Sequence, residues 1–158
     1  MSMTITAAIS QSTAILLERA RQAGFTTEEL LDIVAANDES RLERAATEHF
    51  TYEDWISYAK EHGEPLEQAI REGYRLTFNT VNGLKWWLRY KYDIVAEEDY
   101  EVGDGRFNGL KLNAAQIAEL KQVIARNWVV IDEVEGGHDS SVQDRVIDVA
   151  VRAKLNES

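Results

Sequence analysis

Ten consecutive residues, GLKWWLRYKY at positions 83–92, bring together two tryptophans, two tyrosines and three basic side chains. Tryptophan, tyrosine and arginine are the residue types that contribute most binding energy at protein–protein interfaces. The same mixture suits single-stranded nucleic acid, because cations contact phosphates and aromatic rings stack on bases. The chemistry that this segment offers is therefore recognition of another macromolecule.

The other candidates for chemistry do not form a recognisable site. The chain has three histidines, His49, His62 and His138. None of them lies four residues from another, as two metal ligands on a helix would, and the HExxH pattern is absent. The segment GDGRFNG at 103–109 places its last glycine one residue too late for a dinucleotide-binding loop, and a strand is expected to follow it. We therefore expect no metal site and no cofactor.

Catalytic residues are equally hard to identify. No serine stands in a GxSxG turn. The chain has 28 acidic residues, so chance pairs of carboxylates say little about general acid or base catalysis. We expect a non-enzymatic protein without catalytic residues. A small enzyme or ligand-binding module whose groups meet only in space stays as an alternative.

The composition is that of a globular protein, with 44% hydrophobic and 28% charged residues among 158. The absence of cysteine excludes disulfides and thiolate metal sites and gives no sign of an oxidising compartment. The N-terminus has no basic segment before an apolar run, and no stretch approaches the ~18 apolar residues of a membrane span. We therefore expect a cytoplasmic protein that does not enter a membrane.

The positive charge is concentrated in one segment of a chain whose formal net charge is -11. Residues 1–70 carry 13 acidic and 5 basic side chains, and residues 92–158 carry 14 and 7. Between them, residues 71–91 carry one acid, Glu72, against five bases: Arg71, Arg75, Lys85, Arg89 and Lys91. Because the surrounding negative field repels nucleic acid, we expect phosphate binding to be weak and a protein partner to be favoured.

The N-terminal region, residues 1–73, has the apolar spacing of four or five short helices. Thr26 and Glu29 form a capping box at the start of one helix, and Gly73 ends the last. A DNA-binding helix-turn-helix is disfavoured. Both candidates for its second helix, residues 40–49 and 66–73, carry at least as many acids as bases.

Residues 74–135 are expected to form a mixed unit of helices and strands. YRLTFNT at 74–80 alternates in the way that a half-buried strand does. Residues 81–92 fit two structures: the return of a hairpin with a three-residue loop, or a helix capped by Thr80. We favour the helix because it gives the order strand, helix, strand, strand, helix, strand. That order is the ferredoxin-like βαββαβ arrangement.

The expected helix places its aromatic residues on two sides. The stripe that faces the core, with Trp87 at its flank, consists of Val81, Leu84, Leu88 and Tyr92. Trp86 and Tyr90 are i, i+4 neighbours on the opposite side, beside Lys85 and Arg89. The predicted partner-binding residues are Trp86, Tyr90, Arg89, Lys85, Lys91 and Arg75. Three interpretations stay open: burial against the N-terminal helices, contact with a protein, and contact with nucleic acid.

Residues 136–158 are expected to form a Gly136-Gly137 hinge and a last helix. Ser141 and Asp144 would cap this helix, and its apolar residues are Val142, Val146 and Val149. Such a stripe favours oligomerisation through the C-terminal helix, or packing of the helix onto its own domain.

The sequence therefore predicts an α+β protein with an N-terminal helical region (1–73), a ferredoxin-like unit (74–135) and a C-terminal helix (136–158). The expected function is that of a non-enzymatic regulatory or inhibitory protein that binds another macromolecule, in the first place a protein. A special case is a negative surface that imitates DNA, although the basic segment argues against it. The alternative is a nucleic-acid-binding regulator that uses Arg75, Lys85, Arg89 and Lys91.

Overall fold

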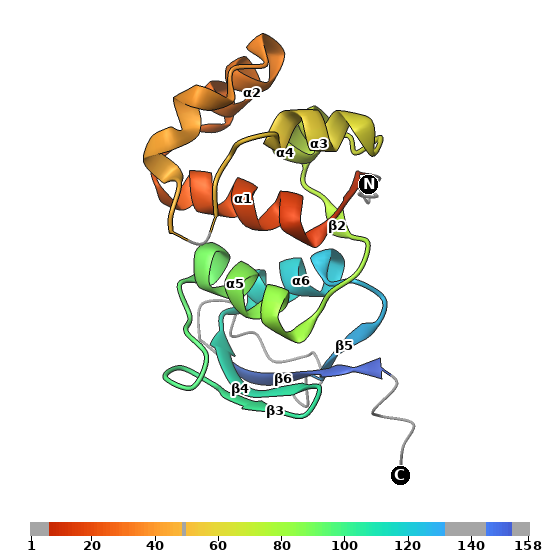
Figure 1. Ribbon diagram of the computed structural model, residues 1–158. Coiled ribbons are helices and arrows are strands. Elements are labelled where there is room, and N and C mark those ends of the chain that lie inside the picture. The colour runs from red at the N-terminus through yellow and green to blue at the C-terminus, as the bar shows by residue number, and fades with distance from the viewer. Residues whose placement is uncertain (1–6, 49, 132–144, 153–158) are drawn as a thin grey trace. The chain divides into compact units, whose positions relative to one another are not determined.

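The computed structural model describes residues 7–48, 50–131 and 145–152 of the chain (Figure 1). These residues contain both helices and sheets, so the α+β class predicted from the sequence is confirmed. The chain divides into two compact units, Met1–Thr77 (unit 1) and Phe78–Ser158 (unit 2). None of the described helices is long and apolar enough to span a membrane.

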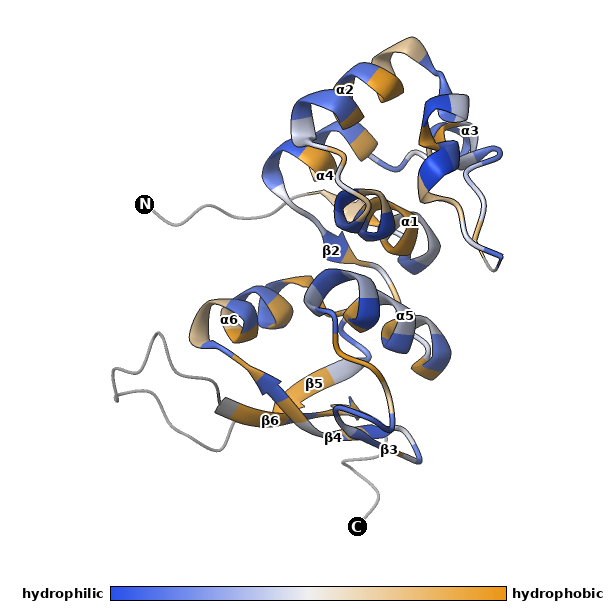
Figure 2. Cartoon of the chain, turned by 90° about the vertical axis from the view of Figure 1, so that its left-hand side faces the viewer, coloured by the Kyte–Doolittle hydropathy of each residue, from blue (hydrophilic) through white to orange (hydrophobic). Residues whose placement is uncertain are grey.

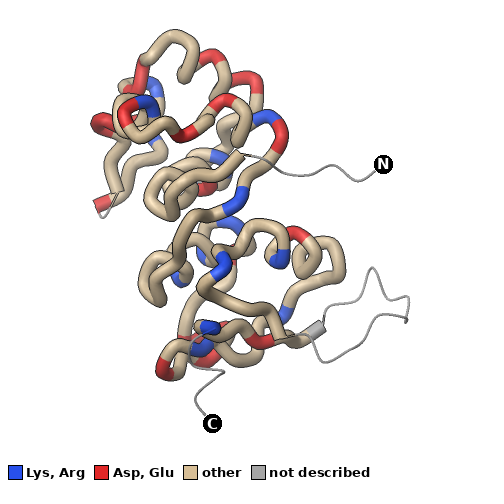
Figure 3. The backbone as a smooth tube through the Cα atoms, turned by 90° about the vertical axis from the view of Figure 1, so that its right-hand side faces the viewer, with Lys and Arg blue, Asp and Glu red and all other residues tan. Residues whose placement is uncertain are grey.

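Unit 1 is built from short helices and one pair of very short strands. Its elements are, in order, β1 (Ala8–Ile9), α1 (Gln11–Gln22), α2 (Thr27–Ala36), the 3-10 helix η1 (Glu39–Ala45), α3 (Trp55–Glu61), α4 (Leu66–Glu72) and β2 (Arg75–Leu76). The predicted capping box of Thr26 and Glu29 opens α2. Acidic residues are spread along the helices of this unit (Figure 3).

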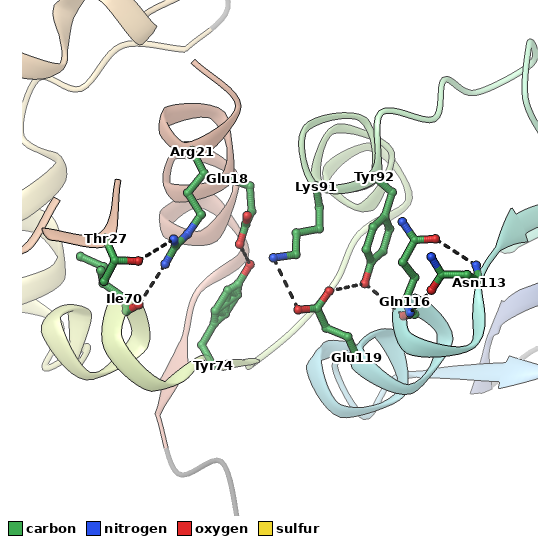
Figure 4. Close-up of polar contacts among 10 residues, drawn as sticks. All are labelled: Glu18, Arg21, Thr27, Ile70, Tyr74, Lys91, Tyr92, Asn113, Gln116 and Glu119. Atoms are coloured by element: carbon green, nitrogen blue, oxygen red, sulfur yellow. Dashed lines mark hydrogen bonds and ion pairs between the residues drawn. The ribbon is translucent and has the colours of Figure 1, made fainter. Parts of the chain in front are cut away.

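The helices of unit 1 enclose an apolar core. Its fully buried side chains include Ala14, Leu17, Leu30, Ile33, Leu42 and Ile56. Two polar side chains of this core are hydrogen-bonded. The Trp55 indole N–H donates to the Thr13 carbonyl at 3.2 Å. The Tyr74 hydroxyl donates to the buried carboxylate of Glu18 at 2.6 Å (Figure 4). Buried polar groups that are satisfied in this way cost little stability.

Of the strand expected at 74–80, only β2 forms, and it belongs to unit 1 and not to the sheet of unit 2. It pairs in parallel with β1, Ala8 lying opposite Arg75. The prediction that this segment opens a ferredoxin-like sheet is therefore wrong. Alternating side chains indicate an extended segment, but they do not identify its partner, and here the partner strand is only two residues long.

Unit 2 consists of a four-stranded sheet with two helices on one face (Figure 1). Its elements are α5 (Val81–Tyr92), β3 (Glu101–Gly103), β4 (Arg106–Leu112), α6 (Ala114–Val123), β5 (Trp128–Ile131) and β6 (Arg145–Val151). The strand order is β3-β4-β6-β5, and every pair is antiparallel. Figure 2 shows hydrophobic residues along β5 and β6. The segment GDGRFNG forms the β3–β4 turn and the first part of β4.

The prediction of a C-terminal helix within residues 136–158 is wrong. Residues 145–151 form β6, a strand inside the sheet. In RVIDVAV the buried residues Ile147 and Val149 alternate with Val146, which is 62% exposed. This period of two, together with the β-branched residues, is typical of a strand. The Gly136-Gly137 hinge and the Ser141 and Asp144 caps lie outside the described residues.

The helix predicted at 81–92 is confirmed as α5. The Thr80 hydroxyl accepts a hydrogen bond from the Gly83 amide at 3.1 Å, as an N-cap does. Trp87 lies at the centre of the buried side, with 0% of its surface exposed, and not at the flank. The predicted core residues Val81 and Tyr92 are only half-buried. The buried side of the helix is therefore centred on Trp87 and not on the predicted stripe.

Asn79, which lies just before α5, forms hydrogen bonds with the segment between α6 and β5. Its side-chain oxygen accepts from the Ala125 amide at 2.8 Å. Its carbonyl accepts from the Asn127 side chain at 2.8 Å and from the Trp128 indole at 3.1 Å. Because Asn79 is 1% exposed, these bonds form away from water and fix the position of α5 on the sheet.

Candidate partner-binding surface

Three predicted residues of α5, Lys85, Trp86 and Arg89, line one hollow of about 160 Å³. The complete lining, called the Trp86 surface below, consists of Asn82, Lys85, Trp86, Arg89, Val95 and Ala96. Four of these residues come from α5 at helical spacings of three and four, which place them on one side of the helix. The other two come from the loop that follows α5. The hollow therefore lies between a helix and its own continuation.

The loop after α5 turns back because of its hydrogen bonds. Asp93 ends the helix in a left-handed conformation, with φ of 58°. The Val95 amide then donates to the Asp99 carboxylate at 2.7 Å, and the Glu97 amide donates to the Tyr100 carbonyl at 2.7 Å. These bonds hold Val95 and its neighbour where they form the second wall of the hollow.

Tyr100 anchors the end of this loop in the core of unit 2. It is 4% exposed, and its ring lies 5.2 Å from that of Phe107. Its hydroxyl makes no hydrogen bond within the described part of the chain. Burial raises the pKa of this hydroxyl above its usual range, and the charges of Asp99 and Glu97 raise it further. The loop is thus held by packing at one end and by backbone bonds along its length.

Aromatic and cationic contacts define the position of Trp86. Its ring is stacked on Tyr90, with centroids 5.7 Å apart and planes at 27°. The guanidinium carbon of Arg89 lies 5.7 Å from the Trp86 ring centroid, within the range of a cation–π interaction. A half-buried indole held on two sides loses little conformational freedom when it binds a partner.

The other three predicted site residues do not line this hollow. Tyr90 is 8% exposed, so its predicted outward position is wrong. Its ring stacks against that of Trp86 from the buried side. Lys91 lies 3.5 Å from Glu119 on α6, whose other oxygen accepts from the Tyr92 hydroxyl (Figure 4). Arg75 is part of β2 in unit 1. Burial on α5 covers a wider arc than the apolar stripe predicts, and this arc includes Tyr90.

Sequence reasoning missed three members of the Trp86 surface: Asn82, Val95 and Ala96. Asn82 lies four residues before Trp86, so helical periodicity places it one turn away on the same side. Val95 and Ala96 gave no such signal, because their position depends on how the loop turns after Asp93.

One hollow of unit 1 is acidic. It measures about 550 Å³ and is lined by Glu39, Ser40, Glu43, Ala46, Thr51, Tyr52, Glu53 and Asp54. Among the described residues, no three His, Asp or Glu side chains lie close enough together to hold a metal ion. His62 stacks on Tyr58 with ring centroids 4.1 Å apart, while His49 and His138 lie outside the described ranges.

Comparison with protein-family models, with curated proteins and with solved structures finds no match to this chain. What the protein does is therefore inferred from the geometry of the Trp86 surface and from the charge around it.

Proposed function

We propose that this chain is a non-enzymatic regulatory or inhibitory protein that acts by binding another protein through the Trp86 surface. The observation that carries the proposal is the grouping of Lys85, Trp86 and Arg89 around one hollow. Tryptophan and arginine are enriched at binding hot spots, where truncation of one residue costs about 2 kcal/mol or more. The contacts of Trp86 with Tyr90 and Arg89 hold the indole before any partner arrives.

A protein partner is favoured over nucleic acid by the number of cations that act together. Nucleic acid binding depends on neutralising several phosphates at once. Of the four cations that a nucleic-acid site would use, only Lys85 and Arg89 line the hollow, and Lys91 faces Glu119. With two cations in a chain of net charge -11, attraction for a polyanion is small.

The Trp86→Ala substitution tests the proposal through partner capture and stability together. We expect the tagged variant to lose a partner that the unchanged chain captures from extracts of its source cells. The free energy of unfolding should fall much less than in Trp87→Ala, because removing a buried tryptophan costs about 3–5 kcal/mol.

Lys111→Gln is the matched control, because Lys111 is an exposed cation of unit 2 outside the Trp86 surface. This variant should capture the partner as well as the unchanged chain does. The proposal fails if Trp86→Ala retains the partner. It also fails if Trp86→Ala unfolds as readily as Trp87→Ala, because Trp86 would then be a core residue.

A further inference from the structure

The hollow of the Trp86 surface has the size of a single side chain. Its volume of about 160 Å³ is smaller than that of small-molecule pockets, which hold roughly 300–1,000 Å³. The indole of Trp86 and the side chains of Val95 and Ala96 give it apolar walls. An apolar side chain of medium size therefore suits the hollow better than a nucleotide or a sugar.

The charges around the hollow differ between its two walls. Lys85 and Arg89 stand one helical turn apart on α5, so they can meet two carboxylates of one bound segment. On the other wall, Ala96 is followed directly by the exposed acids Glu97 and Glu98. The surface thus attracts carboxylates at α5 and repels them at the loop.

On the basis of the proposed function, we infer that the Trp86 surface recognises a short acidic segment of a protein, in which one apolar side chain follows or precedes two carboxylates. The apolar side chain fills the hollow against Trp86. The two carboxylates pair with Lys85 and Arg89, and the residues beyond the apolar side chain are uncharged or basic where they pass Glu97 and Glu98.

The range of electrostatic attraction explains why an acidic chain can bind an acidic segment. At physiological salt the Debye length is about 8 Å, so two carboxylates placed at Lys85 and Arg89 are screened from most other acids of the chain. A longer run of acids or phosphates extends beyond the two cations and meets Glu97 and Glu98. A short acidic segment is therefore selected over a polyanion.

NMR titration of the full chain tests the inference with a defined probe. The probe is the peptide Gly-Glu-Glu-Leu-Ser-Gly, acetylated and amidated so that its ends carry no charge. In about 0.15 M salt we expect saturable shifts of the Trp86 indole N–H and the Ala96 amide. The Trp128 indole, which is buried on β5, should stay unchanged.

Matched variants separate the charges from the hollow. Lys85→Gln and Arg89→Gln should each weaken peptide binding about threefold, the scale of one exposed ion pair. Lys111→Gln should leave the affinity unchanged. A peptide with Gly in place of Leu should give no saturable shift at Trp86. A peptide with Gln in place of both Glu residues should bind about tenfold more weakly, the product of two exposed ion pairs.

Three results would overturn the inference: no saturable shift, the same affinity for the Gln-containing peptide, or tighter binding of a short oligothymidylate. The last result would favour nucleic acid. Failure here is distinct from failure of the proposed function. If the peptide does not bind but Trp86→Ala still abolishes partner capture, only the acidic segment is wrong. If the peptide binds but Trp86→Ala retains the partner, the proposed function is wrong.

Discussion

Two adjacent tryptophans of α5 have different environments because one helical step turns the chain by about 100°. Trp87 is fully buried, and its ring meets that of Tyr92 edge-on with centroids 5.5 Å apart. Trp86 is half-buried and faces the loop residues Val95 and Ala96. At this scale the spacing of residues was sufficient to separate a core tryptophan from a candidate contact residue. It was insufficient for Tyr90, whose burial depends on packing that no single stripe describes.

The Tyr100 hydroxyl makes the stability of the fold sensitive to alkali. Its pKa is raised in the folded state, so the folded chain keeps a proton that the unfolded chain loses near a pKa of about 10. Its contribution to the free energy of unfolding is therefore complete below that pH and is lost as the pH rises toward the higher folded-state pKa.

We predict that Tyr100→Phe reduces the fall in the free energy of unfolding at alkaline pH. Stability at neutral pH should not fall, because the hydroxyl has no hydrogen bond within the described residues. Urea unfolding between about pH 7 and 11 measures the effect. Tyr58→Phe, at an exposed position, should keep the alkaline loss. The prediction would be contradicted if the free energy of unfolding fell with pH to the same extent in Tyr100→Phe and in the unchanged chain.

At the scale of elements, α5 depends on its attachment to the rest of unit 2. Asn79 binds the loop before β5 through its side chain and its backbone. The buried side of α5, with Leu84, Trp87 and Leu88, is the side that packs into the core. A weaker attachment at Asn79 should therefore loosen the helix that carries Lys85, Trp86 and Arg89.

We predict that Asn79→Ala lowers the free energy of unfolding by about 1–3 kcal/mol, since it leaves the Ala125 amide without its buried acceptor. Urea unfolding at neutral pH measures this change. Asn82→Ala is the control: this asparagine is exposed on α5, and alanine favours a helix. Equal losses in both variants would show that the Asn79 bonds contribute nothing specific.

Elements with strong local signals could be predicted from the sequence, and those defined by distant pairing could not. The capping residue Thr80 and the apolar spacing of residues 81–92 identified α5. The two-residue strand β1 is too short for a periodic signal, and the alternation of residues 74–80 did not identify it as the partner of β2. β6 was missed because its valines were grouped with Val142 into a helical stripe, although RVIDVAV alternates with period two.

At the scale of the whole molecule, a local basic surface stands in a chain of net charge -11. The sequence predicted where the aromatic and cationic residues gather, and three of its six site residues line one hollow. It could not predict the second wall, because Val95 and Ala96 reach the hollow only through the turn after α5. An overall negative charge disfavours wrong partners, while Lys85 and Arg89 provide attraction at short range.

Site-specific photocrosslinking tests the central claim that a protein binds at the Trp86 surface. A photoreactive amino acid replaces Lys85 in the full chain, and the same amino acid at Lys111 serves as the control. In extracts of the source cells, we predict one protein adduct from position 85, its loss when Trp86→Ala is added, and no such adduct from position 111. Adducts to nucleic acid, or the same protein adduct from both positions, would contradict the account.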